Sequence, residues 1–159
     1  MKIRVGFGFD VHRLNEGEQL WLGGILITHT KGTVAHSDGD VLIHAICDAL
    51  LGAANLRDIG FHFPDTSADF KGIDSKELLK TVIKLIEEKS WQVENIDSTL
   101  CLEKPKINPL INDMVATLAP ILKVDADAVS IKATTNEQMG FVGREEGVTA
   151  YAVVLLKSK

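Results

Sequence analysis

Strict alternation of side-chain type in the first ten residues limits the folds open to this chain. Large apolar residues occupy the odd positions from 3 to 9, whereas glycine or a charged residue occupies each even position from 4 to 10. Successive side chains of a β-strand point to opposite faces, so this spacing predicts a strand over residues 2–10 whose two faces differ. A sheet is therefore part of the expected fold.

Strand-like and helix-like patterns then follow one another along the chain. The predicted strands span residues 92–103, 129–134 and 148–156, the predicted helices span 39–54, 74–89 and 108–122, and Gly23-Gly24 marks a hairpin within 19–28. Residues 55–73 and the glycine-punctuated segment 135–147 are expected to be loops. Because the two kinds of element interleave within one domain, residues 1–159, we predict an α+β fold, an α/β sandwich with a mixed β-sheet and helices packed on one face.

Polar residues mark where the predicted helices begin. Ser37-Asp38 precedes the helix over 39–54, and Asp74-Ser75-Lys76-Glu77 is similar to a capping box before the next one. Asn108-Pro109 supplies an N-cap and a first-turn proline for the helix over 108–122. We therefore expect Ser37 or Asp38, and Asn108, to cap helices.

Charge and hydropathy exclude some classes of function. The net charge of −5 argues against general nucleic-acid binding, because affinity for a phosphate backbone comes from clustered Lys and Arg. There is no signal-peptide pattern and no apolar run long enough to span a bilayer. Cys47 and Cys101 lie in apolar segments without paired spacing. We expect a cytoplasmic protein with reduced thiols that binds neither nucleic acid nor membrane.

Three residues form a candidate metal site. Asp10 and His12 leave the same face of a strand if the first strand continues that far, and His44 lies on the predicted helix 39–54. Two imidazoles and one carboxylate leave an open coordination position, as in catalytic zinc sites. Asp40 and Asp48 stand one turn either side of His44, and either is a candidate partner for its second ring nitrogen.

A plainer interpretation of the same three residues also exists. Asp10 and His12 would then cap a turn after the strand, and His44 would be a hydrogen-bonded core histidine. The acidic residues around His44 favour the metal site, because carboxylates are costly to bury in an apolar helix unless they are paired or linked to a metal.

Four further polar segments are candidates for ligand contacts, each with a structural alternative. Residues 36–40 suit a helix cap or a phosphate site, and residues 58–65 suit polyol contacts or a turn-rich surface loop. Residues 133–137 suit phosphate with a hard cation such as Mg²⁺, or a plain strand end. Residues 140–147 suit a hairpin loop in which Arg144 pairs with neighbouring glutamates. No phosphate-binding P-loop, dinucleotide fingerprint or nucleophile elbow is present.

Together these segments resemble one family, the 2-C-methyl-D-erythritol 2,4-cyclodiphosphate synthases of the non-mevalonate isoprenoid pathway. The matches occur in family order over nearly the whole chain, and their joint occurrence is far more specific than any single one. They are G-x-D-x-H at 8–12, H-S-D-G-D-V at 36–41, H-A-x-x-D-A-L-L-G-A at 44–53, D-I-G-x-H-F-P-D-T at 58–66, K-P-K at 104–106, K-A-T-T-N-E at 132–137 and G-F-x-G-R-x-E-G at 140–147.

The resemblance implies a phosphorus–oxygen lyase that turns 4-diphosphocytidyl-2-C-methyl-D-erythritol 2-phosphate into a cyclic diphosphate and releases CMP. It implies one Zn²⁺ per subunit and Mg²⁺ or Mn²⁺ with the substrate diphosphate. The implied roles are zinc binding by Asp10, His12 and His44, Mg²⁺ binding by Glu137, phosphate contacts by His36 and Ser37, methylerythritol contacts by Asp58, Gly60 and Asp65, and a cytidine and diphosphate pocket lined by Lys106, Ala133, Thr134 and Thr135.

The resemblance also implies a homotrimer built by sheets around a threefold axis, with active sites between subunits. Phe9, Phe141 and Arg144 would face an axial cavity that can hold an isoprenoid diphosphate. Tyr151 stands where many family members have a glutamate, which leaves the axial polar arrangement and its ligand open. Ile107-Asn108 replaces the more usual Met-Leu beside the nucleotide pocket.

Two rival functions accompany this interpretation. A zinc phosphohydrolase would attack with metal-bound water instead of a substrate phosphate. A non-catalytic trimeric module would hold a structural metal, although a closed site needs a fourth protein ligand that no cysteine or histidine is well placed to supply. The absence of a protein nucleophile agrees with phosphoryl transfer, which needs positioning and charge neutralisation more than covalent help.

Overall fold

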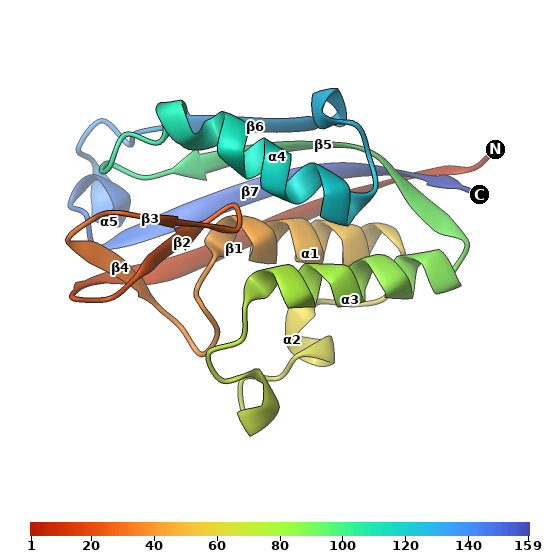
Figure 1. The fold of residues 1–159 in the computed structure, drawn as a ribbon, viewed down its shortest axis with the longest axis horizontal. Helices are drawn as coiled ribbons and strands as arrows, with labels where there is room; N and C mark the ends of the chain where they lie inside the picture. The colour runs from red at the N-terminus through yellow and green to blue at the C-terminus, as the bar shows by residue number, and fades with distance from the viewer.

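A mixed five-stranded sheet of order β4-β1-β7-β5-β6 forms the frame of the protein, in a computed structural model that describes all of residues 1–159. Only β5 and β6 run parallel, and every other neighbouring pair is antiparallel. The predicted mixed sheet is therefore confirmed. Its strands are β1 (Ile3–Glu16), β4 (Lys31–Val34), β5 (Trp91–Cys101), β6 (Val129–Thr134) and β7 (Gly147–Ser158) (Figure 1).

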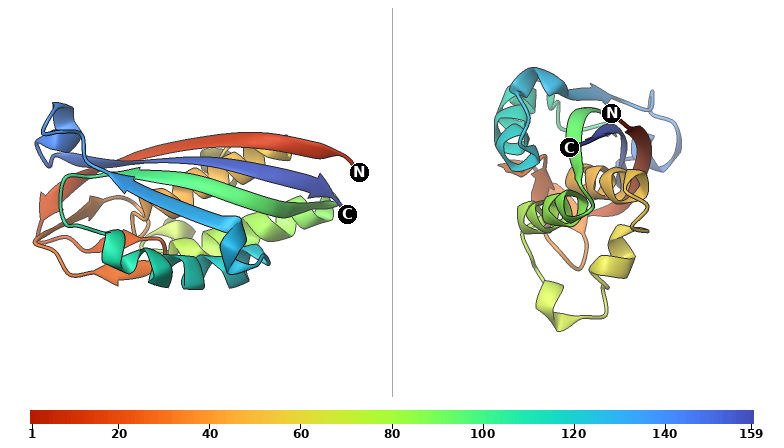
Figure 2. Two further views of the ribbon diagram at one scale, coloured as in Figure 1. Left: turned by 90° about the horizontal axis from the view of Figure 1, so that it is seen from above. Right: turned by 90° about the vertical axis from the view of Figure 1, so that its right-hand side faces the viewer.

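The three long helices cover a single face of this sheet. They are α1 (Val41–Ala53), α3 (Ser75–Glu88) and α4 (Ile111–Leu122). Seen from above, all three lie together on the same side of the strands, as Figure 2 shows. The helical layer predicted from sequence is thus confirmed. The smaller elements are the hairpin β2 (Leu20–Leu22) and β3 (Ile25–Ile27), and the short helices α2 (Ile59–His62) and α5 (Gly140–Gly143).

The alternation in β1 places glycine under the helical layer. A Cβ atom added to Gly6 would lie 1.9 Å from the carbonyl oxygen of Ala49, and one added to Gly8 would lie 1.8 Å from that of Ala45. Helix α1 therefore sits directly on the strand backbone. The large apolar side chains of β1 point the other way and are exposed, among them Phe7 and Val5.

The exposed sheet face continues onto the central strand. Tyr151 and Val153 of β7 stand across from Phe9 and Phe7 of β1, and all four side chains are exposed. The Phe9 and Tyr151 ring centroids lie 5.1 Å apart. We call this patch, made by Ile3, Val5, Phe7, Phe9, Val11, Tyr151 and Val153, the bare sheet face.

The core lies between the sheet and the helices. Helix α1 packs on β1 and β7 and also against α3, so almost its entire circumference is buried. Its sequence is accordingly apolar except along one stripe, formed by His44, Asp48 and Gly52, which is the side that is not fully buried. In contrast, α3 buries one face only, which contains Leu79, Val82 and Ile86.

Two of the predicted helix caps are wrong. Asp40 caps α1, accepting the Ile43 N–H at 3.0 Å, because the Asp38 carboxylate is already occupied by Ser75 and by the Asp40 N–H. Helix α4 begins at Ile111 after a 3-10 turn over Asn108–Leu110, and no side chain caps it. Asn108 is already part of that turn, so its side chain is not in a cap position.

The predicted loops contain short helical turns. Residues 55–73 include α2 and a 3-10 turn over Ala68–Phe70, and residues 135–147 include α5. Phe63 and Phe70 pack edge to face inside the first loop, with ring centroids 5.4 Å apart. Both cysteines are free thiols, Cys47 buried and Cys101 partly so. None of the helices is long and apolar enough to cross a membrane.

Candidate metal centre and ligand cavity

Three potential ligand atoms converge between β1 and α1. His12 Nε2 lies 3.1 Å from Asp10 Oδ2, and His44 Nδ1 lies 3.1 Å from each of those two atoms. Strand β1 runs to Glu16, so Asp10 and His12 do leave one face of it, as predicted. His44 reaches down from the first half of α1. The three residues that sequence analysis selected for a metal therefore form one cluster.

The geometry of this cluster fits a tetrahedral cation. Ligand atoms at zinc–nitrogen distances of about 2.0–2.1 Å are about 3.3 Å apart in a tetrahedron, close to the observed triangle. A cation at the centre of the triangle would be a common partner for the two ring nitrogens and the carboxylate oxygen. Their side chains are 11–25% exposed, so the cluster has an open side for a further ligand.

Two serines fix the outer nitrogen of His44. His44 Nε2 lies 2.9 Å from Ser75 Oγ and 3.2 Å from Ser37 Oγ. The predicted partners, Asp40 and Asp48, are used elsewhere: Asp40 accepts the N–H groups of the β2–β3 turn and of α1, and Asp48 accepts the Ile59 N–H at 2.7 Å. That prediction is wrong because both carboxylates anchor backbone.

The pKa values of the two histidines are shifted in opposite directions. Burial lowers the pKa of His12, and the charge of Asp10 only partly opposes this. For His44 burial also acts to lower the pKa, but the hydrogen bond with Asp10 and the charges of Asp10, Asp40 and Asp38 together raise it. A metal requires an unprotonated nitrogen from each ring, so the lowered pKa of His12 favours metal binding whereas the raised pKa of His44 opposes it.

The cluster lies in the wall of a cavity of about 620 Å³. Four more of the predicted site residues line the same cavity: His36, Ser37, Gly60 and Asp65. His36 is held by its Nε2 atom, 2.9 Å from the Ser67 carbonyl oxygen. Asp58 does not line the cavity, and its carboxylate instead caps α2 by accepting the Phe61 N–H. Most of the remaining wall is apolar and includes Ile59, Phe63, Phe70, Ile73 and Leu78.

A second group of predicted residues lies elsewhere. Lys106, Ala133, Thr134 and Thr135 line a pocket of about 100 Å³ where β5 and β6 end. Lys106 and Thr134 are exposed. Glu137 lies just beyond, exposed, with its N–H near Thr135 Oγ1.

This second group is separated from the metal cluster within one chain. The strand order places β7 and β5 between β1 and β6. Three strand spacings correspond to about 14 Å. After the roles that the resemblance implies for them, we call the two groups the metal half and the nucleotide half of the predicted site; the metal half comprises the cluster and its cavity, and the nucleotide half comprises Lys106, residues 133–135 and Glu137.

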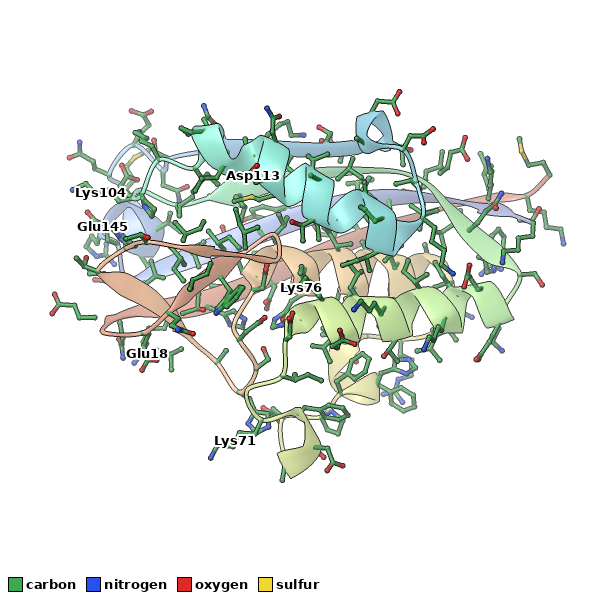
Figure 3. The ribbon with its side chains drawn as sticks, viewed as in Figure 1. Glu18, Lys71, Lys76, Lys104, Asp113 and Glu145 are labelled. Carbon is green, nitrogen blue, oxygen red and sulfur yellow. The ribbon has the colours of Figure 1, made fainter.

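Surface contacts order the loops around the nucleotide half. Lys104 Nζ lies 3.3 Å from Glu145 Oε1 and joins the segment after β5 to the one before β7, and these two side chains lie side by side in Figure 3. Arg144 pairs with Glu146 at 2.9 Å, as the plainer interpretation of that loop predicted. Phe141 is exposed and packs near Gly147. Thus Phe9, Phe141 and Arg144 are all at the surface of the single chain.

Known proteins resemble this chain over almost its full length. The model of the YgbB family matches residues 3–157. The 2-C-methyl-D-erythritol 2,4-cyclodiphosphate synthase of Bacteroides fragilis is 62% identical over 156 residues, which are 98% of each chain. The bifunctional IspDF from Campylobacter jejuni matches with a TM-score of 0.95 and 42% identity over 99% of this chain, which spans 43% of that longer protein. A 2C-methyl-D-erythritol-2,4-cyclodiphosphate synthase with bound CDP has a TM-score of 0.90 and 38% identity over 97% of this chain and all of its own.

Proposed function

The chain belongs to the YgbB family, and from that premise we propose the reaction of a 2-C-methyl-D-erythritol 2,4-cyclodiphosphate synthase in isoprenoid biosynthesis. The substrate is 4-diphosphocytidyl-2-C-methyl-D-erythritol 2-phosphate. An oxygen of the 2-phosphate attacks the β-phosphorus, the bond from that phosphorus to the oxygen bridging to the α-phosphate breaks, and CMP leaves with this oxygen. The product is 2-C-methyl-D-erythritol 2,4-cyclodiphosphate, and the enzyme is a phosphorus–oxygen lyase.

The observation that carries this proposal is the position of the Asp10, His12 and His44 cluster in the wall of an open cavity. Ser37 Oγ and Ser75 Oγ lie near His44 Nε2, but the Nδ1 atom of that ring belongs to the candidate metal cluster. A histidine that binds a metal is not a free general base, so neither serine has a base to activate it as a nucleophile. A reaction whose nucleophile belongs to the substrate fits such a site. The cavity holds the two ends of the substrate near each other, which raises the effective concentration of the attacking phosphate.

In the metal half, Asp10, His12 and His44 would hold Zn²⁺, which would supply positive charge to neutralise the transferred phosphoryl group. The Ser37 hydroxyl and the His36 ring face the same cavity and orient the phosphate end of the substrate. Gly60 and Asp65, which line the same cavity, contact the methylerythritol moiety. Asp58 is proposed there too, through the conformation of α2 that it caps.

In the nucleotide half, Lys106 and the Ala133-Thr134-Thr135 segment bind the cytidine and diphosphate. The CDP-bound relative supports a cytidine-diphosphate-linked substrate. Glu137 would help to hold Mg²⁺ or Mn²⁺ with the substrate diphosphate, since Mg²⁺ is usually bound by one or two carboxylates together with phosphate oxygens. Glu137 is exposed and free to face such a ligand.

A homotrimer with sites between subunits unites the two halves. The bare sheet face supports this, because an apolar patch of that size on a sheet is normally covered by another surface. A trimer formed around it places the metal half of one subunit next to the nucleotide half of its neighbour. Phe9, Phe141 and Arg144 then face the axis, where an isoprenoid diphosphate is the proposed ligand and Tyr151 replaces the usual acidic residue.

The decisive experiment is incubation of the purified protein, Zn²⁺ and Mg²⁺ with the diphosphocytidyl substrate. Cyclic diphosphate and CMP in equal amounts are the expected products, measured by ³¹P NMR. Linear hydrolysis products would instead identify a zinc phosphohydrolase. The absence of turnover in zinc-loaded, folded protein would favour a non-catalytic metal module, a function that the enzymatic relatives do not support.

A further inference from the structure

The structure assigns a positioning role to Ser75: its hydroxyl fixes the ring of His44, so that His44 Nδ1 is the nitrogen presented to the metal. The inference rests on the metal half described above and on three side chains from three segments. They are Asp38 before α1, His44 in α1, and Ser75 at the start of α3. The sequence pattern indicates only a helix-capping segment at Ser75.

Ser75 is completely buried and all its polar atoms have partners. Its backbone N–H donates to Asp38 Oδ2 at 2.8 Å, and its hydroxyl donates to Asp38 Oδ1 in a short contact. The Asp40 N–H donates to that same oxygen at 3.0 Å. With three donors on one carboxylate, Asp38 is a fixed acceptor, and a fixed acceptor defines where the Ser75 hydrogen points.

The direction of that hydrogen decides which ring nitrogen of His44 carries a hydrogen. A hydroxyl has one hydrogen, and Ser75 gives it to Asp38, so toward His44 its oxygen can only accept. The His44 Nε2 atom, 2.9 Å away, must therefore carry the hydrogen. In a neutral imidazole this leaves Nδ1 with its lone pair free, and Nδ1 is the atom that meets Asp10 Oδ2 and His12 Nε2.

By the same argument, the hydroxyl hydrogen of Ser37 is not used in a hydrogen bond with His44. Ser37 Oγ accepts the Gly39 N–H and lies 3.2 Å from His44 Nε2, which is already a donor. The Ser37 hydrogen therefore has no acceptor in these two groups and is available to the cavity that Ser37 lines. Ser75 is thus the positioning group, and Ser37 keeps a donor for the phosphate end of the substrate.

The test measures zinc affinity by competition with a chromogenic chelator, in the full-length protein. Ser75→Ala is expected to lower zinc affinity by about 10- to 100-fold, the usual effect of removing a partner behind a metal-bound histidine. Ser98→Ala is the matched control. Ser98 is equally buried and donates to the Ser130 carbonyl at 2.9 Å, but it lies on β5 away from the metal. Its zinc affinity should equal that of the wild type.

A second variant keeps the inference testable if Ser75→Ala does not fold. Ser37→Ala removes the other oxygen near His44 Nε2 and should leave zinc affinity within about threefold of the wild type. A larger loss in Ser37→Ala would overturn the assignment of Ser75. Folded Ser75→Ala that binds zinc as tightly as the wild type would overturn it as well. These zinc measurements do not depend on turnover, so a failure of the proposed reaction would be seen separately.

Discussion

The metal half and the nucleotide half are proposed to serve one reaction, yet they are built differently. In the metal half the outer nitrogen of His44 lies against two serines of the same chain, and these serines are themselves held by backbone or by Asp38. In the nucleotide half Lys106 is exposed, and the Thr134 hydroxyl bonds only to the neighbouring Thr135 carbonyl. The first half is pre-organised by one chain, whereas the second is exposed and, in the proposed trimer, would meet the metal half of a neighbouring subunit.

The largest expected effects come from removing one side chain from each half and comparing zinc affinity with cyclisation. His44→Ala should lower zinc affinity by more than about 100-fold and abolish cyclisation, because it removes a direct ligand. Lys106→Ala should abolish or strongly reduce cyclisation and leave zinc affinity unchanged. Chelator competition and ³¹P NMR measure the two quantities. His29→Ala, a histidine outside both halves, is the control; reduced zinc affinity in Lys106→Ala would show that the halves are not independent.

Mixing those two inactive variants tests whether the halves meet across subunits. If each site combines the metal half of one subunit with the nucleotide half of another, random mixed trimers of His44→Ala and Lys106→Ala contain about one intact site in four. Refolding the two together should then restore about a quarter of wild-type turnover. Mixing without subunit exchange serves as the control, and a refolded mixture with no activity would place both halves within one subunit.

A charge introduced on the bare sheet face should leave zinc binding by the metal half intact and abolish the turnover that also needs the nucleotide half. Phe7 is 64% exposed, so Phe7→Asp costs little within one chain but places a carboxylate in the proposed interface. We expect a monomer by sedimentation velocity that still binds zinc and has lost turnover. Lys80→Asp on the outer face of α3 is the control. A trimeric Phe7→Asp protein would exclude this face as the interface.

Stability should show the same contrast on a smaller scale. Asp40 holds Gly23, Gly24 and Ile43 N–H groups behind the metal half, so Asp40→Ala loses a helix cap and leaves buried donors unpaired. A loss of about 3 kcal/mol is expected. Lys104→Ala removes an exposed pair beside the nucleotide half and should cost less than about 1 kcal/mol. Urea denaturation measures both; similar losses would contradict the contrast.

Local patterns in the sequence were enough to predict the strands and helices of the fold and the candidate metal ligands. The period of two in β1 fixes the shared direction of Asp10 and His12, and helical spacing places His44 on a buried helix. These features depend on neighbours a few residues away. The ligand cluster then needed only one further condition, that α1 packs on β1.

The partners of these ligands could not be predicted in the same way. Ser75 meets His44 across 31 positions of sequence, and the meeting depends on how the segment before α1 packs on the start of α3. Asp40 and Asp48 were the nearer candidates along the helix, but backbone N–H groups claim both. Which acceptor pairs with His44 and which pairs with backbone N–H groups depends on tertiary packing. The spacing of residues along one helix gives no information on that packing.

The glycines of β1 set the distance between β1 and α1 at the candidate metal centre, although they supply no ligand atom. Gly8 lies two residues before Asp10, and the carbonyl it contacts belongs to Ala45, the residue after His44. The gap between strand and helix is the gap between the carboxylate and the imidazole. A methyl group at position 8 would therefore widen the coordination sphere with every ligand still present, and ion selectivity can change through a residue that never touches the ion.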